Sequence, residues 1–141
     1  MQLRTETACE GMARRHKLWA HASRQRMTLI LGGKCTACRS TERLEFDCIV
    51  PMGHMHHAGS APDRIVFYRR QMQAGNVQLL CTHCNALKSN IDFDQWITAL
   101  SMVRQREKEM RPSPIPGRDT AITPAERVEI LRDVLNILRS R

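Results

Sequence analysis

The residues best suited to chemistry in this sequence are two pairs of cysteines, each pair separated by two residues. The first pair is Cys35-Thr36-Ala37-Cys38, and the second is Cys81-Thr82-His83-Cys84. A Cys-x-x-Cys pair places two thiolates on one tight turn, and two pairs complete the tetrahedral four-sulfur shell of structural zinc. The spacing therefore predicts one structural Zn²⁺ with four ligands: Cys35, Cys38, Cys81 and Cys84. Two separate redox-active pairs are the alternative interpretation, and they require a different context.

Between the two pairs lies a segment rich in further ligand and proton-transfer groups. Asp47 and Cys48 come first, and three histidines follow on a short stretch: His54, His56 and His57. A carboxylate binds hard divalent cations, and a neutral imidazole accepts protons or binds transition metals. The cysteine pairs therefore bracket a candidate reactive site. A polar loop and a second metal site are the other interpretations of the histidines. Cys9 and Cys48 belong to neither pair.

Length, composition and charge limit the kind of protein that carries this segment. A chain of 141 residues forms one domain, or one small domain with an appendage. Aromatic residues are 4% of the sequence, so the core is modest and gains from a metal staple. The formal net charge is +8, and residues 1–43 hold nine Lys/Arg against three Asp/Glu. This excess favours an anionic partner, most often nucleic acid, over a merely solvated basic surface.

The sequence gives no sign of secretion or of membrane insertion. No apolar stretch follows Met1 as in a signal peptide, and none approaches the ~18 apolar residues of a membrane span. Paired Cys-x-x-Cys motifs in a reducing compartment indicate metal binding more often than disulfides. We therefore expect a cytoplasmic protein without a membrane partner.

A basic helix is expected before the first cysteine pair, from residue 12 to about residue 31. This stretch holds neither Pro nor Gly, and Gly32-Gly33 ends it. Residues 1–11 lack periodicity and are expected to form a flexible N-terminus. One side of the helix seats apolar residues, and the exposed side can lie along a phosphate backbone through five cations: Arg14, Arg15, Lys17, Arg24 and Arg26.

Two short strands are expected around the reactive segment. Residues 44–50 are rich in β-branched and aromatic residues and stop at Pro51, and residues 77–80 form the second strand. Residues 52–63 contain glycines and a proline and are expected to form a loop that carries the histidines. A short helix over 64–74 and a turn at Gly75-Asn76 connect this loop to the second strand.

Helices are expected to follow the second cysteine pair. One helical turn starts near Asn85, and Asp92 caps a longer helix that runs to about residue 110. Residues 111–122 contain three alternating prolines and predict a linker. Thr123-Pro124-Ala125-Glu126 is a capping box that opens a final helix over 123–141, which packs back on the domain or meets a partner. The main domain then covers residues 12–110.

The motif core, residues 35–91, resembles the HNH endonuclease family. The residues that carry the resemblance are Asp47-Cys48-Ile49-Val50-Pro51, Gly75-Asn76-Val77-Gln78-Leu79-Leu80-Cys81 and Cys84-Asn85-Ala86-Leu87-Lys88. Members often read Asp-His-Ile-x-Pro, then Asn-Leu-Gln-x-Leu-Cys, then Cys-His/Asn-x-x-Lys, with two Cys-x-x-Cys pairs on structural zinc. The resemblance implies an α+β fold: a small ββα-metal (His-Me finger) unit stapled by a four-cysteine zinc and flanked by N- and C-terminal helices.

The resemblance also implies a role for each matching residue. Asp47 and Asn85 would hold a catalytic Mg²⁺ or another divalent cation, Asn76 would brace the loop that carries the base, and Lys88 would contact phosphate. The sequence departs from the family where the base histidine follows the aspartate, because that position is Cys48. A thiol is a poor substitute for an imidazole. Either one of His54, His56 and His57 takes over, with His57 the first choice and His56 the second, or the protein is catalytically weak or inactive.

The expected function is therefore metal-dependent hydrolysis of DNA phosphodiester bonds. The alternative, which Cys48 favours, is a catalytically weak or inactive zinc-knuckle protein, derived from such a nuclease, that binds DNA or acts as an adaptor. Asn85 has a further interpretation as a simple helix cap. Small proteins of this kind resemble those of phages and mobile elements, which implies a phage or bacterial-host setting and a packaging terminase as a further partner.

Overall fold

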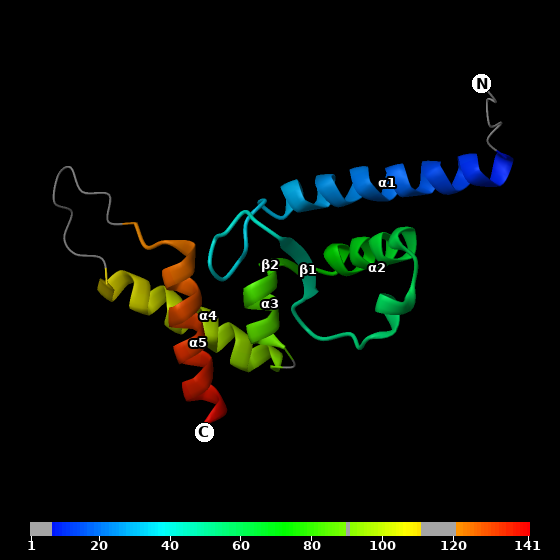
Figure 1. Cartoon of the computed structure of the whole chain (residues 1–141). Helices are drawn as coiled ribbons and strands as arrows, with labels where there is room; N and C mark the ends of the chain where they lie inside the picture. Colours follow the sequence, from blue (N-terminus) through cyan, green and yellow to red (C-terminus); the bar gives the residue numbers. More distant parts are fainter. Residues whose placement is uncertain (1–6, 90, 111–120) are drawn as a thin grey trace.

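The computed structural model describes residues 7–89, 91–110 and 121–141. Within them the chain forms five α-helices, one 3-10 helix and a two-stranded antiparallel sheet (Figure 1). The order is α1 (Ala8–Ile30), β1 (Leu44–Cys48), η1 (Met55–Ala58), α2 (Ala61–Gln73), β2 (Val77–Cys81), α3 (Thr82–Lys88), α4 (Phe93–Met110) and α5 (Pro124–Arg139). The predicted α+β class is confirmed. Over the described ranges, no helix combines the length and apolar character needed to cross a bilayer.

Helix α1 is longer than the sequence predicts at its N-terminus. Thr7 caps it, because its side chain accepts a hydrogen bond from the Glu10 amide while the Glu10 carboxylate accepts one from the Thr7 amide. The expectation of a flexible segment through residue 11 is therefore wrong from Thr7 onward, and residues 1–6 lie outside the described residues. The predicted C-terminal end is confirmed, with Gly32 at φ 93°.

The sheet separates two apolar clusters. Strand β1 pairs with β2 so that Phe46 lies opposite Leu79 and Cys48 opposite Val77. These four side chains join residues of α1 and α2, among them Ala20 and Tyr68, in one cluster. Since successive side chains of a strand alternate between faces, Asp47, Gln78 and Leu80 lie on the other face. The expected strands are thus present, although β1 ends at Cys48 and not at residue 50.

The second apolar cluster contains the four paired cysteines. It joins Leu80 of β2 to Trp96 and Val103 of α4 and to Leu131 and Val134 of α5. Trp96 is completely buried. In Figure 1, α4 and α5 cross beside α3, on the opposite side of the sheet from α1 and α2. The cysteine turns are therefore part of the packed interior and not an appendage to it.

The loop between β1 and α2 is more ordered than expected. Residues 55–58, which include His56 and His57, form the 3-10 helix η1, and α2 begins at Ala61 and not at residue 64. A second capping box explains the earlier start: the Ser60 side chain accepts from the Asp63 amide, and Asp63 accepts from Ser60. Pro62 lies in the first turn of α2, where its missing N–H has no cost.

Helix α5 packs back on α4, which is the first of the two outcomes expected from the sequence. The capping box of Thr123 and Glu126 is present, and Asp92 accepts a hydrogen bond from the Gln95 amide at the start of α4. The predicted linker ends earlier than expected, because Ile122 is buried in the cysteine-containing cluster. Residues 111–120, the rest of that linker, lie outside the described residues.

A buried ion pair joins α4 to α5. The Arg127 guanidinium contacts the Glu107 carboxylate, and both side chains are more than nine-tenths buried. Arg39, which follows the first cysteine pair, lies 3.8 Å from the same carboxylate. The pair thus links the two C-terminal helices next to the cysteine turns.

We expect Arg127→Met to lower the free energy of unfolding by about 3–5 kcal/mol, because it leaves the Glu107 carboxylate buried without its main partner. Chemical denaturation measures this change. The double variant Glu107→Met/Arg127→Met should recover most of the loss. Arg132→Ala, which removes an exposed pair with Glu129 on the same helix, should change stability by less than about 1 kcal/mol. Equal losses in the Arg127 and Arg132 variants would contradict a special role for the buried pair.

Candidate metal centre and adjoining cleft

The four predicted zinc ligands meet at one point. The Sγ atoms of Cys35, Cys38, Cys81 and Cys84 all lie within 4.8 Å of one another, and all four residues are buried. Cys38 Sγ is 3.6 Å from Cys81 Sγ. A tetrahedral site with Zn–S bonds of about 2.3 Å has sulfur–sulfur edges of about 3.8 Å, so both the donor set and the spacing fit zinc. Among the described residues this is the one metal-compatible group of three or more Cys, His, Asp or Glu.

Local hydrogen bonds hold each cysteine pair on its turn. In the first turn, the Arg39 amide donates to the Cys35 carbonyl and the Cys35 amide donates to the Ser40 carbonyl. Arg39 takes a positive φ of 65°, which closes the turn. In the second, the Cys81 sulfur caps α3 by accepting from the Cys84 amide. The first pair therefore lies on a loop turn and the second on a strand-to-helix junction.

The protonation of these thiols shows why a cation belongs among them. Hydrogen bonding by the Cys84 thiol lowers the pKa of Cys35 to about 4. Burial raises the pKa of Cys38 to about 12, and the same bond to Cys35 raises the pKa of Cys84. The pKa of one thiol is thus lowered while the pKa values of two neighbours are raised, because burial and the shared hydrogen bond disfavour several thiolates in one site. A bound divalent cation would remove that penalty and hold all four as thiolates.

A cleft of about 320 Å³ lies on the β1 side of this centre. Its walls bring together most of the predicted reactive residues: Asp47, Cys48, His54, His56, His57, Asn85 and Lys88. They come from β1, the histidine segment and α3. Residues distant in sequence thus share one cavity, although Asn76 does not line it.

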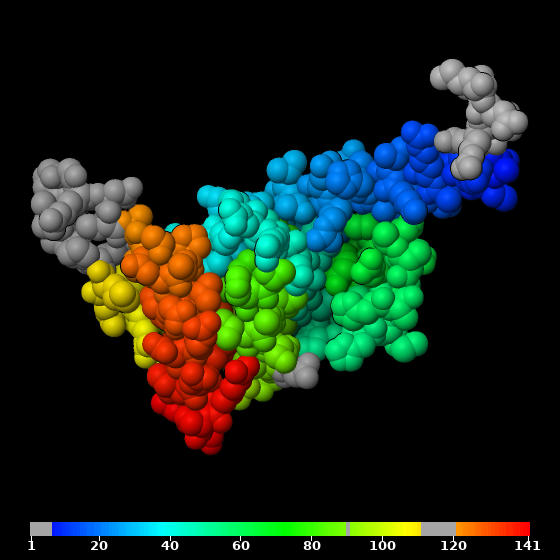
Figure 2. Space-filling view, in the orientation of Figure 1, coloured from blue at the N-terminus to red at the C-terminus, as the bar shows by residue number. Residues whose placement is uncertain are grey.

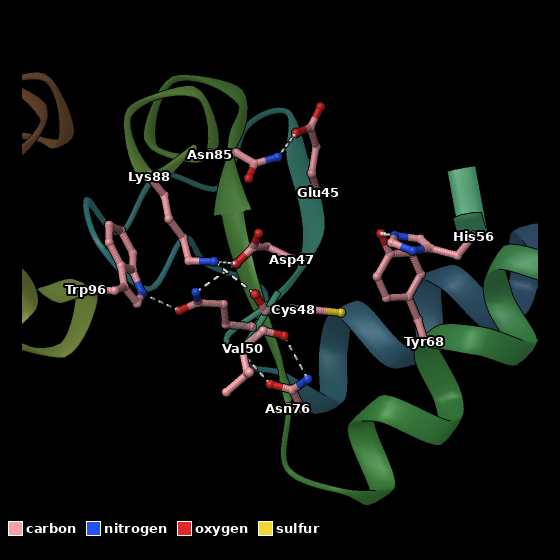
Figure 3. Close-up of polar contacts among 11 residues, drawn as sticks. Glu45, Asp47, Cys48, Val50, His56, Tyr68, Asn76, Asn85, Lys88 and Trp96 are labelled. Atoms are coloured by element: carbon pink, nitrogen blue, oxygen red, sulfur yellow. Dashed lines mark hydrogen bonds and ion pairs between the residues drawn. The ribbon is translucent and has the colours of Figure 1, made fainter. Parts of the chain in front are cut away.

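Asp47 lies in a buried polar network that the sequence does not reveal (Figure 3). Its Oδ2 accepts from Lys88 Nζ at 2.8 Å and from Gln78 Nε2 at 2.9 Å. Lys88 Nζ also donates to the Cys48 carbonyl, and the Trp96 indole donates to Gln78 Oε1. Lys88 is only 1% exposed. The expectation that Lys88 contacts phosphate is therefore corrected, because its ammonium is enclosed and engaged by Asp47.

The two candidate asparagines occupy different positions. Asn85 Nδ2 donates to Glu45 Oε2 at 2.6 Å, so Glu45 fixes which end of the amide faces β1. Asn76 braces the segment after β1: its Oδ1 accepts from the Val50 amide at 2.7 Å, and its Nδ2 donates to the Val50 carbonyl. Asn85 thus borders the cleft, whereas Asn76 supports the chain that leads to the histidines.

Two of the loop histidines, His56 and His57, differ in their accessibility. His56 is stacked on Phe67, and its Nε2 lies 3.3 Å from the Tyr68 hydroxyl. Its Nδ1 is buried without a hydrogen-bond partner. Burial, followed by the charge of His57, lowers the pKa of His56, so its ring is neutral near pH 7. His57 is exposed and lines the cleft, with its ring 4.0 Å from that of His56.

The Cys48 thiol is not suited to act as a proton acceptor. It is buried, and burial raises its pKa, as does the neighbouring Asp47 charge. The group is therefore a protonated thiol at neutral pH. In Figure 3 the Cys48 sulfur points toward Tyr68 and away from Asp47. Cys48 is one of the buried side chains in the apolar cluster that the sheet forms with α1 and α2.

The five basic residues predicted on α1 are all exposed: Arg14, Arg15, Lys17, Arg24 and Arg26. Arg24 is held in place, because it donates to the Leu44 carbonyl and covers the Phe46 ring at 4.8 Å. Sequence reasoning missed Gln78, Glu45 and Tyr68 as parts of the site. A polar glutamine within an otherwise apolar strand was the available signal for Gln78, since buried polar groups need partners.

Comparison of the chain with protein-family models, with curated proteins and with solved structures gives no match.

We expect the purified protein to contain one zinc per chain, and Cys84→Ser to lose both the zinc and cooperative unfolding. Binding of structural zinc contributes about 10–16 kcal/mol in small zinc domains, comparable to the whole stability of a domain, about 5–15 kcal/mol. Metal analysis and thermal unfolding measure the two effects. Cys9→Ser, which changes an exposed cysteine outside the cluster, is the matched control. A metal-free protein with the same unfolding temperature would refute the zinc staple.

Proposed function

We propose that this chain is a metal-dependent HNH-type endonuclease that hydrolyses DNA phosphodiester bonds. The observation that carries the proposal is the cleft in which Asp47, Asn85 and the loop histidines share one cavity. Strand β1, the histidine segment and helix α3 form its walls, and the chain also holds a cysteine cluster that fits zinc. The order and spacing of the motifs that resemble the family support the same assignment.

Two side-chain oxygen atoms, one from Asp47 and one from Asn85, are available to bind a hard divalent cation. Within the described residues, no hydrogen bond engages Asp47 Oδ1 or the Asn85 side-chain oxygen, since the bonds of these residues use Asp47 Oδ2 and Asn85 Nδ2. Mg²⁺ is commonly bound by one or two protein oxygens, with water and substrate phosphate completing its shell. A cation held there would stabilise negative charge on the phosphate and on the leaving oxygen. The Lys88 ammonium offsets the negative charge of the Asp47 carboxylate, so Asp47 attracts a cation less strongly. The substrate phosphate would supply the further negative charge that cation binding needs.

His57 is the better candidate for the general base. Its ring is exposed to the cleft, whereas one nitrogen of His56 is buried and the other faces Tyr68. A neutral imidazole can accept the proton of the attacking water. The neighbouring His56 ring packs against His57 and limits its movement. His57 therefore takes the role that Cys48 cannot fill, and His56 positions it.

The second candidate function is DNA binding without cleavage. Cys48 at the position of the family's base favours it, and so does the buried ammonium of Lys88 beside Asp47. In that case the cysteine cluster supports a binding module, and the cleft performs no hydrolysis. DNA is the partner in both cases, and a packaging terminase is a further proposed partner by family resemblance alone.

We expect nicking of supercoiled plasmid with Mg²⁺, Mn²⁺ or Ni²⁺, and its loss in Asn85→Ala and Asp47→Asn. The asparagine in the second variant still accepts a hydrogen bond from Lys88, so the buried network survives while the carboxylate is removed. Asp94→Asn, an exposed change on α4, is the matched control. Zinc content should not change in any variant. Cleavage at wild-type rates by both site variants would refute the assignment.

For the base, we expect His57→Ala to reduce the cleavage rate by about 10²-fold or more, the usual contribution of general acid–base catalysis. His16→Ala, which removes an exposed histidine of α1, should leave the rate unchanged. Rate measurements with each variant give the comparison. If the wild-type protein carries zinc and binds DNA but cuts with none of the metals, the binding module is the correct function.

A further inference from the structure

A second, larger cavity adjoins the cleft. It measures about 480 Å³ and lies between α1 and α2, over β1. Figure 2 shows α1 lying along α2 on this side of the molecule. We refer to this cavity as the α1–α2 groove. It shares four lining residues with the cleft: Phe46, His57, Tyr68 and Asn85. The groove and the cleft are therefore adjacent cavities. They meet at His57, the candidate base, and at Asn85, a candidate metal-binding residue.

The groove is lined by cations from both helices. Lys17 and Arg24 come from α1, and Arg64 comes from α2. The lining contains one carboxylate, that of Glu45, and Asn85 already engages it. Over the described residues, neither Lys17 nor Arg64 forms an ion pair. Like charges that face a shared cavity repel one another, so an anion between them stabilises the arrangement.

The size of the groove limits what it can hold. Its volume lies within the range of pockets for small ligands, about 300–1,000 Å³. A whole DNA duplex is too large to enter a cavity of this volume, since its major groove alone spans about 12 Å. The floor is made of β1 and the Tyr68 side of α2, and Arg24 is fixed there over the Phe46 ring. The cavity therefore suits a single sugar–phosphate chain and not a double helix.

We propose that the α1–α2 groove binds one unpaired DNA strand and leads it to His57 and Asn85. Lys17 and Arg64 contact its phosphates from opposite walls, and Arg24 contacts it from the floor. This inference rests on the proposed function for its choice of DNA, but it concerns binding and not cleavage. It adds Arg64 of α2 to the contacts expected on α1, and it gives the strand a path that ends at the candidate centre.

The test measures the affinity of a fluorescent single-stranded oligonucleotide by anisotropy, without added divalent metal, so that cleavage plays no part. Each phosphate contact to a single strand contributes about 0.7 to the slope of log K against log salt. At 0.1 M salt, one contact is thus about fivefold in affinity. We expect Arg64→Ala and Lys17→Ala each to weaken binding about fivefold and to reduce the salt slope by about 0.7.

The matched control is Arg69→Ala, which removes an exposed cation of α2 that lines neither cavity. It should bind like the wild type, and thermal unfolding should show that all three variants are folded. A blunt duplex of the same sequence serves as the second ligand, and Arg64→Ala should weaken its binding less than that of the single strand. Equal losses for both ligands, equal losses in the Arg64 and Arg69 variants, or no loss in the Arg64 variant would overturn the proposal. A wild-type protein that binds the single strand in the groove but cuts DNA with no divalent metal would instead count against the proposed nuclease.

Discussion

Four buried sulfur atoms, all within 4.8 Å of one another, join the turn before β1 to the end of β2 and the first turn of α3. The same sulfurs belong to the apolar cluster that seats α4 and α5. With few aromatic side chains available, a hydrophobic interior of this size gains much from such a junction. The sheet, the candidate cleft and the C-terminal helices therefore depend on one small region of the chain.

A chain of buried polar contacts connects that region to the cleft. Trp96 of α4 binds Gln78, Gln78 binds Asp47, and Asp47 binds Lys88 of α3. Because each group is largely enclosed, each partner that is lost leaves a neighbour unsatisfied. The carboxylate of Asp47 is consequently held in one orientation by the core, and only its second oxygen remains for a ligand.

The sequence predicts the local patterns well and the long-range placements poorly. The cysteine spacing, the glycine pair after α1 and the Thr123 capping box are short-range signals, and each is present in the structure. The burial of Lys88 has no such signal, because it follows from the way in which α3 packs on the sheet and on Trp96. Ile122 looks like part of a linker until α4 and α5 enclose it. The joint use of α1 and α2 in one groove likewise requires their packing, which no local pattern encodes.

Helix α3 has seven residues, and it carries Cys84, Asn85 and Lys88 within a little more than one turn. An inserted or deleted residue there would rotate the groups that follow it relative to those that precede it, so the three could not all keep their partners. The histidine segment is different, since Asn76 secures it at Val50 and the Ser60 cap begins the next helix. Between those two anchors, the segment contacts α2 through His56, which packs on Phe67 and Tyr68. The architecture thus joins a frame, made of α3 and the sheet, to a separate segment that carries His56 and His57.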